Sequence, residues 1–252
     1  MTRVVKLGGR VQDDPRLPAA LVAAASRDDL VVVHGGGDSV TAVQRRLGNE
    51  PRFVGGRRVT SAEELGVVRM VLSGSANKRL VAALCAAGAR AVGISGEDGR
   101  LLSAHTAPGA PLGRVGERVT ADATLLHDLL AAGWLPVVSP LACDADDPDG
   151  AGLNVNGDDA ATAIAVALGA AELVFVADVP GVVRGGSVIP SLTNDEAAAL
   201  IADGVAAGGM VAKLEAAHLA LARGIARVRI ADVASLDDAA RGTVLIPSPT
   251  AA

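Results

Sequence analysis

The chain is poor in aromatic residues: its 252 residues include one Trp, two Phe and no Tyr. Proteins that bind single-stranded nucleic acid stack its bases on aromatic side chains, so this function is not expected here. Hydrophobic residues make up 50% of the chain and charged residues 20%. The chain can therefore bury a large core, which must be mainly aliphatic, and its composition is not that of a disordered protein.

Cysteine and excess charge are also scarce. Cys85 and Cys143 are the only cysteines and form no CxxC pair, so neither a disulfide framework nor a cysteine zinc site is expected. The net charge is −5 without a block of like charge, which argues against nucleic acid and against a polybasic membrane anchor. We find neither an apolar signal segment nor an uncharged run of the ~20 residues that span a membrane. We therefore expect a soluble, cytoplasmic protein.

Short β-branched runs alternate with longer segments rich in Ala and Leu. This alternation predicts an α/β fold, a three-layer αβα sandwich around a mainly parallel open sheet. The runs expected to be buried strands are residues 3–7, 30–34, 90–94, 135–139, 173–177 and 227–231. The segments expected to be helices are residues 16–26, 38–47, 62–86, 122–131, 158–168, 195–203 and 209–223. Residues 53–60 and 99–120 are typical of hairpins.

The turn-rich stretch DADDPDGAG, residues 144–152, is the best candidate for a boundary. It would separate an N-terminal lobe, residues 1–150, from a C-terminal lobe, residues 151–252, on one continuous sheet. We find no internal repeat and no low-complexity linker that would indicate another division.

Two glycine motifs follow predicted strands. In KLGG, residues 6–9, the glycines let the backbone approach a ligand closely, and Lys6 can act as a point charge on phosphate. In VVVHGGGDSV, residues 31–40, three glycines lead into a helix whose first amides can bind an anion. Neither motif has the spacing of the phosphate loop or of the dinucleotide fingerprint. Ordinary turns remain the alternative, and we expect His34 to pack near its strand end rather than to bind a metal.

Two further stretches carry polar groups that could bind a substrate. Adjacent arginines in GGRRVT, residues 55–60, could clamp a carboxylate or could simply be solvated. In LNVNGDD, Asn154 and Asn156 face the same side of an extended segment and could bind a carboxylate and a carbonyl. Equally, Asp158 could be the N-cap of the helix that follows.

Two motifs in the second half of the chain complete the set. Lys213 in GGMVAK lies near the start of a predicted helix, where its positive charge opposes the helix macrodipole. An anion bound between the lysine and the helix N-terminus would remove this conflict. The alternative is a surface lysine whose ammonium group lies in solvent. In ADVPGV a strand ends at Asp178, and ligands of α/β sheets lie beyond such strand ends.

In this order the motifs KLGG, HGGG, GxRVT, NK, NVNGD, ADVPGV and GGMxxK resemble those of the amino acid kinase family, over nearly the whole chain. Within that family they are most similar to the kinases of N-acetyl-L-glutamate. The resemblance implies an N-terminal lobe that binds N-acetyl-L-glutamate and forms a homodimer, and a C-terminal lobe that binds ATP. The reaction would phosphorylate the side-chain carboxylate, giving N-acetylglutamyl 5-phosphate, in arginine biosynthesis.

The resemblance also implies roles for individual residues. Lys6 and Lys213 would stabilise the transferring phosphoryl group, and Asp158 would hold both lysines. Arg58 would bind the substrate α-carboxylate; the other substrate-binding residues would be Gly36, Gly37, Asn154 and Asn156. The nucleotide site would include Gly9, Asp178, Val179, Pro180, Gly181 and Val182, with Mg²⁺ held mainly by the ATP phosphates.

This chemistry also fits the residues themselves. A carboxylate nucleophile is already ionised at neutral pH, so no general base is needed in a chain without a His or Cys constellation. Phosphoryl transfer then depends on positioning and charge neutralisation. Asp159 is expected to be only a favourable acid in the first helical turn.

The chain also departs from the family pattern. Arg57 stands where an apolar residue is more common, and the usual proline before Lys213 is missing. Members inhibited by arginine carry an extra N-terminal helix; here the first strand starts at about Arg3, so we expect a homodimer insensitive to arginine. Two alternatives stay open: a kinase for 2-aminoadipate or glutamate on a carrier protein, and a non-catalytic nucleotide or amino-acid sensor.

Overall fold

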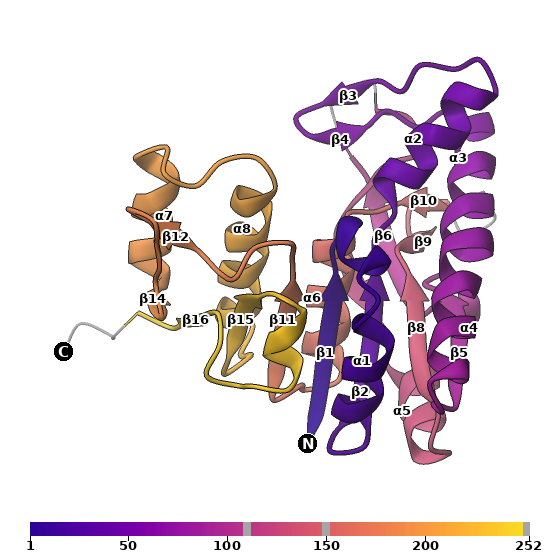
Figure 1. The fold of residues 1–252 in the computed structure, drawn as a ribbon. Helices are drawn as coiled ribbons and strands as arrows, with labels where there is room; N and C mark the ends of the chain where they lie inside the picture. The colour runs from indigo at the N-terminus through magenta and orange to yellow at the C-terminus, as the bar shows by residue number, and fades with distance from the viewer. Residues whose placement is uncertain (108–111, 148–151, 249–252) are drawn as a thin grey trace.

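The computed structural model describes residues 1–107, 112–147 and 152–248, which fold as a three-layer αβα sandwich (Figure 1). Its main sheet contains β1 (Thr2–Leu7), β2 (Asp29–His34), β5 (Ala91–Ser95), β8 (Leu135–Ser139), β11 (Glu172–Val176), β14 (Ser191–Thr193), β15 (Val228–Ala231) and β16 (Thr243–Ile246). The strand order is β14-β16-β15-β11-β1-β2-β8-β5. Every neighbouring pair is parallel except β15 with β16. The predicted fold class and the six predicted strands are confirmed.

Helices cover both faces of the main sheet. They are α1 (Leu17–Ala25), α2 (Gly37–Arg46), α3 (Ala62–Arg69), α4 (Asn77–Ala86), α5 (Thr124–Ala131), α6 (Gly157–Ala167), α7 (Asn194–Ala202) and α8 (Gly209–Ala222). Core residues of α1 and α4 pack on one face, and those of α5, α6 and α8 on the other. The single helix predicted over 62–86 is instead α3 and α4 joined by a π-helical segment, Met70–Ala76. The extra residue of a π turn shifts the helical register, and Leu72 then lines a hollow described below.

A smaller sheet and two hairpins complete the fold. The small sheet has the order β10-β9-β6-β7, formed by β6 (Leu102–Thr106), β7 (Gly116–Ala121), β9 (Leu141–Asp144) and β10 (Leu153–Asn154). The hairpins are β3 (Phe53–Val54) with β4 (Arg57–Arg58), and β12 (Val183–Arg184) with β13 (Ser187–Val188). Short 3₁₀ helices span Arg10–Asp13, Asp98–Arg100 and Val233–Leu236. Antiparallel pairing of β3 with β4 and of β6 with β7 confirms the two predicted hairpins.

The predicted lobe boundary at residue 150 lies outside the described residues. On its two sides, β9 and β10 pair antiparallel. Strand β1 from the first half of the chain pairs with β11 from the second, so both halves contribute strands to the main sheet. In the part of the chain that the structure describes, no helix combines the length and apolar character needed to cross a membrane.

The alternation of side chains along the central strands places Lys6 and His34 on opposite faces of the main sheet. Val4 of β1 packs with the α6 side of the core, whereas Val32 of β2 packs with the α1 and α4 side. Side chains two residues further along a strand point to the same face. Lys6 therefore faces α6, and His34 faces α4.

A buried carboxylate connects three central strands at their amino-terminal ends. Glu172 of β11 accepts hydrogen bonds from Arg3 Nε of β1 (3.0 Å) and from Arg229 Nε of β15 (3.0 Å). Arg227 Nε donates to the same carboxylate at 2.9 Å. Arg229 is fully buried. Because a charge removed from water needs a partner, the fully buried Arg229 depends on Glu172, whereas Arg3 also pairs with Asp28 at 3.2 Å.

We predict that Glu172→Gln destabilises the fold by about 3 to 5 kcal/mol, because it leaves the fully buried guanidinium of Arg229 without a countercharge. Urea unfolding followed by circular dichroism measures the change. Glu50→Gln is the matched control, since Glu50 pairs with Arg45 on the exposed surface and its loss should change stability little. Equal midpoints for the two variants would contradict the assignment of Glu172 as the common partner.

Candidate active site

Three loops meet at the carboxyl ends of the adjacent strands β2, β1 and β11 (Figure 1). The backbone joins them directly: Gly35 N–H donates to Leu7 O at 3.0 Å, and Gly8 N–H donates to Val176 O at 2.9 Å. A Cβ on Gly8 would lie 3.3 Å from Val176 O, so a glycine allows this close approach. The KLGG, HGGG and ADVPGV motifs therefore lie side by side, where α/β sheets bind ligands.

Two lysines from opposite ends of the chain meet at Asp158. Lys6 Nζ lies 2.7 Å from Asp158 Oδ1, and Lys213 Nζ lies 3.6 Å from Oδ2. Lys6 reaches the site from β1, Asp158 from the first turn of α6, and Lys213 from the first turns of α8. The Lys6 contact is an ion pair without hydrogen-bond alignment, so Asp158 Oδ1 has no aligned donor among the described residues.

The charge of this cluster is only partly balanced. Burial lowers the pKa of Lys213, the positive charge of Lys6 lowers it further, and Asp158 acts in the opposite direction. Two ammonium groups share one carboxylate in a largely buried position. An additional anion would relieve the repulsion between them.

The start of α6 corrects one prediction. Asp158 is not its N-cap; Asn156 is, and Asn156 Oδ1 accepts a hydrogen bond from Asp158 N at 2.7 Å. Asp158 instead lies inside the first turn, with its carboxylate directed at the lysines. A Cβ on Gly157 would lie 3.3 Å from Lys6 Cε, so the glycine lets the helix start approach Lys6 closely.

A hollow of about 200 Å³ lies on one side of the lysines, between α2, the β3–β4 hairpin and the start of α6. The predicted substrate-binding residues that line it are Gly37, Arg58, Asn154 and Asn156. Asn154 Nδ2 donates to Thr60 Oγ1 at 3.2 Å. Gly36 does not line the hollow itself but lies between Gly35 and Gly37, which do.

Arg58 is buried in this hollow and held by neutral groups. One guanidinium nitrogen donates to Gln44 Oε1, and the other donates to Thr41 Oγ1 (2.8 Å) and to Gly37 O (2.9 Å). The guanidinium carbon also lies 4.8 Å from the Phe53 ring centre. Burial lowers the pKa of Arg58. No described carboxylate lies within 4.0 Å of it, so it can take a ligand carboxylate.

The supports of Arg58 were missed by the sequence argument. Gly37, Thr41 and Gln44 are four and three residues apart, which places them on one face of a helix. That spacing was the available signal. Arg57 behaves differently from its neighbour, because it lies 3.5 Å from Glu117 Oε2 and is half-buried.

A second hollow of about 390 Å³ lies on the other side of the lysines. Gly9, Asp178, Val179 and Lys213 line it, together with Gly8, Arg10, Val11, Asp38, Ala177, Ala207, Gly209 and Met210. Asp178 is exposed and pairs with Arg10 at 3.1 Å.

The rest of the ADVPGV motif does not reach the lining of that hollow. Val182 is buried, and its N–H donates to Thr243 Oγ1 at 2.8 Å. A Cβ on Gly181 would lie 2.8 Å from Thr243 Oγ1. Pro180, between them and Val179, is exposed.

Asp159 is more than a helix-start acid, because it lines a larger cleft of about 650 Å³ between the β3–β4 hairpin and α8. Burial raises the pKa of Asp159, Arg57 lowers it, and the negative charges of Asp158 and Glu215 raise it further. The cleft separates residues of the first hollow, the one that Arg58 lines, from the start of α8.

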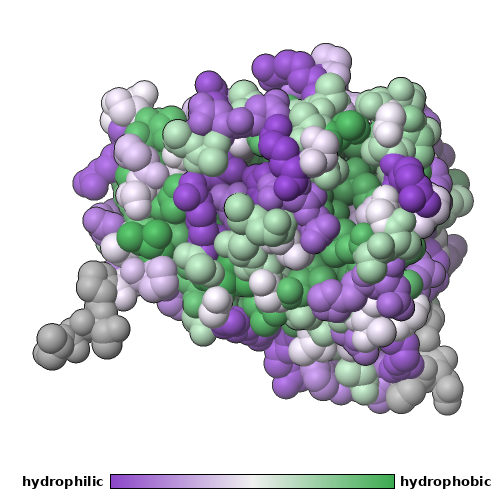
Figure 2. Space-filling view, turned by 90° about the horizontal axis from the view of Figure 1, so that it is seen from below, coloured by the Kyte–Doolittle hydropathy of each residue, from purple (hydrophilic) through white to green (hydrophobic). Residues whose placement is uncertain are grey.

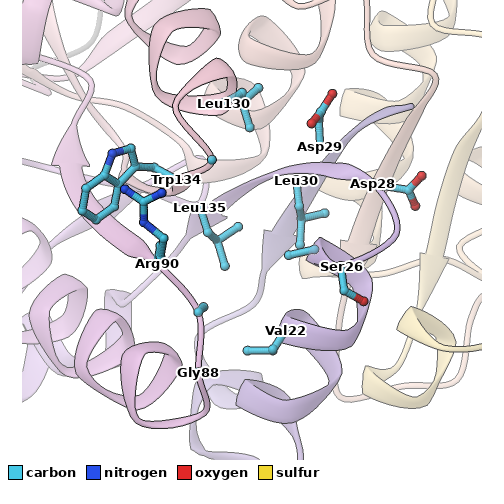
Figure 3. A pocket seen from close by; sticks show the side chains of 13 residues that line it. Val22, Ser26, Asp28, Asp29, Leu30, Gly88, Arg90, Leu130, Trp134 and Leu135 are labelled. Carbon is cyan, nitrogen blue, oxygen red and sulfur yellow. The ribbon is translucent and has the colours of Figure 1, made fainter.

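A further hollow of about 240 Å³ lies at the opposite end of the sheet (Figure 3). Arg90 stacks over Trp134 at its rim, with the guanidinium carbon 4.6 Å from the ring centre. Figure 2 shows this lower face, on which hydrophilic and hydrophobic residues are mixed. The hollow lacks both the glycine loops and the lysines, so the candidate active site is the one at the carboxyl ends of the strands.

Known proteins resemble the chain over nearly its whole length. The acetylglutamate kinase of Chloroflexus aurantiacus is 46% identical over 239 residues, which are 93% of each protein. That of Roseiflexus castenholzii is 45% identical over 249 residues, which are 97% of this chain and 94% of the relative. The solved structure of smu.665 from Streptococcus mutans UA159 is 26% identical with a TM-score of 0.86, over 97% of this chain and 98% of the other. The model of the amino acid kinase family matches residues 1–232, and the chain therefore belongs to the amino acid kinase family.

Proposed function

We propose that the chain is an acetylglutamate kinase, which transfers the γ-phosphoryl group of ATP to the side-chain carboxylate of N-acetyl-L-glutamate in arginine biosynthesis. The observation that carries this proposal is the position of Lys6, Asp158 and Lys213 between two hollows. One hollow offers the buried cation Arg58, and the other is lined by glycine loops. The similarity to acetylglutamate kinases over more than nine-tenths of the chain supports the same reaction.

Charge neutralisation is the main contribution of the chain to this reaction. The attacking carboxylate is ionised at neutral pH, so no side chain has to remove a proton. Lys6 and Lys213 are placed to stabilise negative charge on the transferring group and on the leaving oxygen. Asp158 keeps the two ammonium groups together, and its single charge leaves the cluster net positive.

The acceptor substrate is held by its α-carboxylate and its N-acetyl group, at the end opposite the reacting side-chain carboxylate. Arg58 takes the α-carboxylate through the guanidinium N–H groups that its contacts with Gln44, Thr41 and Gly37 leave free, and these contacts fix the guanidinium plane. Asn154 and Asn156 line the same hollow as Arg58 and offer amide contacts to the N-acetyl group and its neighbours. This arrangement directs the side-chain carboxylate toward Lys6.

The donor hollow fits a nucleotide. Its glycine backbone at Gly8 and Gly9 allows close approach of phosphates, and Lys213 supplies the countercharge. Asp178 and Val179 would contact the nucleoside, while Pro180, Gly181 and Val182 would shape the strand end behind them. Bound ATP with Mg²⁺ would supply the phosphoryl group and a neutralised leaving group, with the ion held mainly by the phosphates.

The two lobes and the oligomeric state belong to the same proposal. The acceptor hollow is built mainly from residues before 150, and the donor hollow largely from residues after it, as expected for an acceptor lobe and a nucleotide lobe. We further propose that the enzyme is a cytoplasmic homodimer.

We expect purified protein to form an acyl phosphate from ATP and N-acetyl-L-glutamate, trapped by hydroxylamine as the hydroxamate. Glutamate and aspartate should give little product, because they lack the N-acetyl group expected to contact Asn154 and Asn156. Carrier-linked 2-aminoadipate is the third acceptor to test. Turnover of that substrate alone would replace the proposed acceptor, and no turnover with any acceptor would indicate a sensor.

Lys213→Ala should reduce kcat by about 10²- to 10³-fold, the usual effect of removing one group that stabilises developing charge. Far-ultraviolet circular dichroism should remain that of the wild type, because the partners of Lys213 among the described residues are Gly209 O and Asp158, both at the site. Arg223→Ala, at the exposed end of the same helix, is the control and should retain activity. Equal kcat values in the two variants would refute the assigned role.

Arg58→Lys should raise KM for N-acetyl-L-glutamate by about 10-fold or more, because the three donors of an ammonium cannot both keep the contacts that orient Arg58 and bind the carboxylate. The matched Arg57→Lys change, one residue earlier, should leave KM nearly unchanged because that side chain already pairs with Glu117. Steady-state kinetics with varied acceptor at saturating ATP separates the two. A larger KM effect at Arg57 would reassign the carboxylate contact.

A further inference from the structure

The carbonyl oxygen of Gly35, inside the HGGG motif, accepts two hydrogen bonds from side chains. Gln12 Nε2 donates to it at 2.9 Å, and His34 Nδ1 lies 2.8 Å from it. Gln12 belongs to the 3₁₀ helix that follows the KLGG loop, so the two glycine loops are tied through this one oxygen. Neither side chain has a part in the reaction as proposed above.

The hydrogen-bond network behind His34 fixes where its proton lies. Asn77 Nδ2 donates to Val137 O at 2.9 Å, and Asn77 Oδ1 accepts from Lys78 Nζ at 3.1 Å. The orientation of the Asn77 amide is therefore determined by its other partners. His34 Nε2 lies 3.2 Å from Asn77 Nδ2, a donor, so Nε2 must be the acceptor. The ring proton is then on Nδ1 and is donated to Gly35 O.

His34 keeps this neutral form at physiological pH. The side chain is fully buried, and this burial lowers its pKa to about 4, with the positive charges of Lys6, Lys78 and Arg79 acting in the same direction. A neutral ring has one donor and one acceptor, as the network requires.

By fixing the carbonyl of Gly35, these side chains also fix the direction of the N–H of Gly36 in the same peptide. In a trans peptide the C=O of one residue and the N–H of the next point in opposite directions. Gly35 O lies with His34 on the α4 face, so Gly36 N–H points toward the opposite face, where Lys6 meets Asp158. Neither Gly36 N–H nor Gly37 N–H donates a hydrogen bond to any described residue.

The position of Gly36 is also sterically fixed. Its φ is 158°, and a Cβ added there would lie 2.7 Å from Leu72 Cδ2. Gly36 precedes α2 without a side-chain cap, so the first amides of that helix add to the field of its N-terminus.

We propose that His34 and Gln12 are positioning residues, which hold the Gly35–Gly36 peptide so that Gly36 N–H faces the transferred phosphoryl group. Asn77 and Lys78 support them by fixing the tautomer of His34. This inference rests on the proposed kinase function. It gives the NK motif at residues 77–78 a role: it orients a backbone donor without touching the substrate.

Two replacements of His34 separate positioning from packing. His34→Asn keeps a donor at the δ position, within reach of Gly35 O, and loses the contact with Asn77. His34→Gln keeps an acceptor near Asn77 and loses the δ donor. We expect His34→Gln to lower kcat roughly 10-fold. Complete loss of one oxyanion donor typically costs about 10²- to 10³-fold, and this variant misorients the Gly36 N–H without removing it. We expect His34→Asn to stay near the wild type and KM for N-acetyl-L-glutamate to be unchanged in both.

Gln12→Leu provides an independent test, because it removes the second donor from a partly exposed 3₁₀ helix. It should lower kcat without changing KM. The double variant with His34→Gln should lose more than the product of the single effects, since each single variant keeps one donor on Gly35 O. His105→Gln, on the exposed side of the small sheet, is the control and should be fully active.

The outcomes distinguish this inference from the function on which it rests. An inactive wild type would overturn both. An active wild type with equal losses in His34→Asn and His34→Gln would show a packing role and overturn the inference alone. If the His34 variants fail to fold, an unchanged kcat in Gln12→Leu overturns it, and a lowered kcat at constant KM supports it.

Discussion

The ion pairs of Asp158 with two lysines are the interaction on which the rest of the site depends. Lys6 comes from the first strand of the chain and Lys213 from its last long helix, and one carboxylate brings their ammonium groups together. The β1–β11 pairing places the two halves in register, and the start of α6 projects Asp158 between them. Because one negative charge is shared by two positive charges, the centre is prepared for a further anion. The two hollows on either side of it then acquire distinct roles, one for the acceptor and one for the donor.

The layered fold could be predicted from the sequence because its physical signal is repeated. Valine-rich strands buried on both faces, such as residues 31–33, alternate with helices whose apolar positions recur at helical spacing. The π-helical segment at Met70–Ala76 could not be predicted, because a one-residue shift in register leaves the apolar pattern of residues 62–86 nearly unchanged. The alternative that Asp158 is the N-cap of α6 was wrong for a related reason: Asn156 and Asp158 are both good caps, and the lysines that use Asp158 are distant in sequence.

The site could be predicted in part, and the missing part consists of supports. Motifs marked the groups that face the ligands, such as Lys6, Arg58 and Asn154. Gln44 and Thr41 hold Arg58, and Gln12 holds the carbonyl oxygen of Gly35, but none of these three residues belongs to a motif. Their partners are backbone carbonyls and side chains from other elements, which only the packed structure brings together. Asp159 illustrates the same limit: burial raises its pKa, and the cleft that it lines is formed by the β3–β4 hairpin and α8, which are distant from it in sequence.

Lysine usage connects the site with the network behind the HGGG motif. The chain contains 20 arginines but only three lysines, Lys6, Lys78 and Lys213. Two of these meet at Asp158, and the third donates to Gly93 O and to the amide that orients His34. An ammonium is a compact charge with three rotatable donors, whereas a guanidinium is a wide planar fork. A chain that uses arginine almost everywhere else keeps lysine where a small cation must fit against backbone or phosphate. Lys78 thus belongs with the two lysines of the site, although it lies on the other face of the sheet.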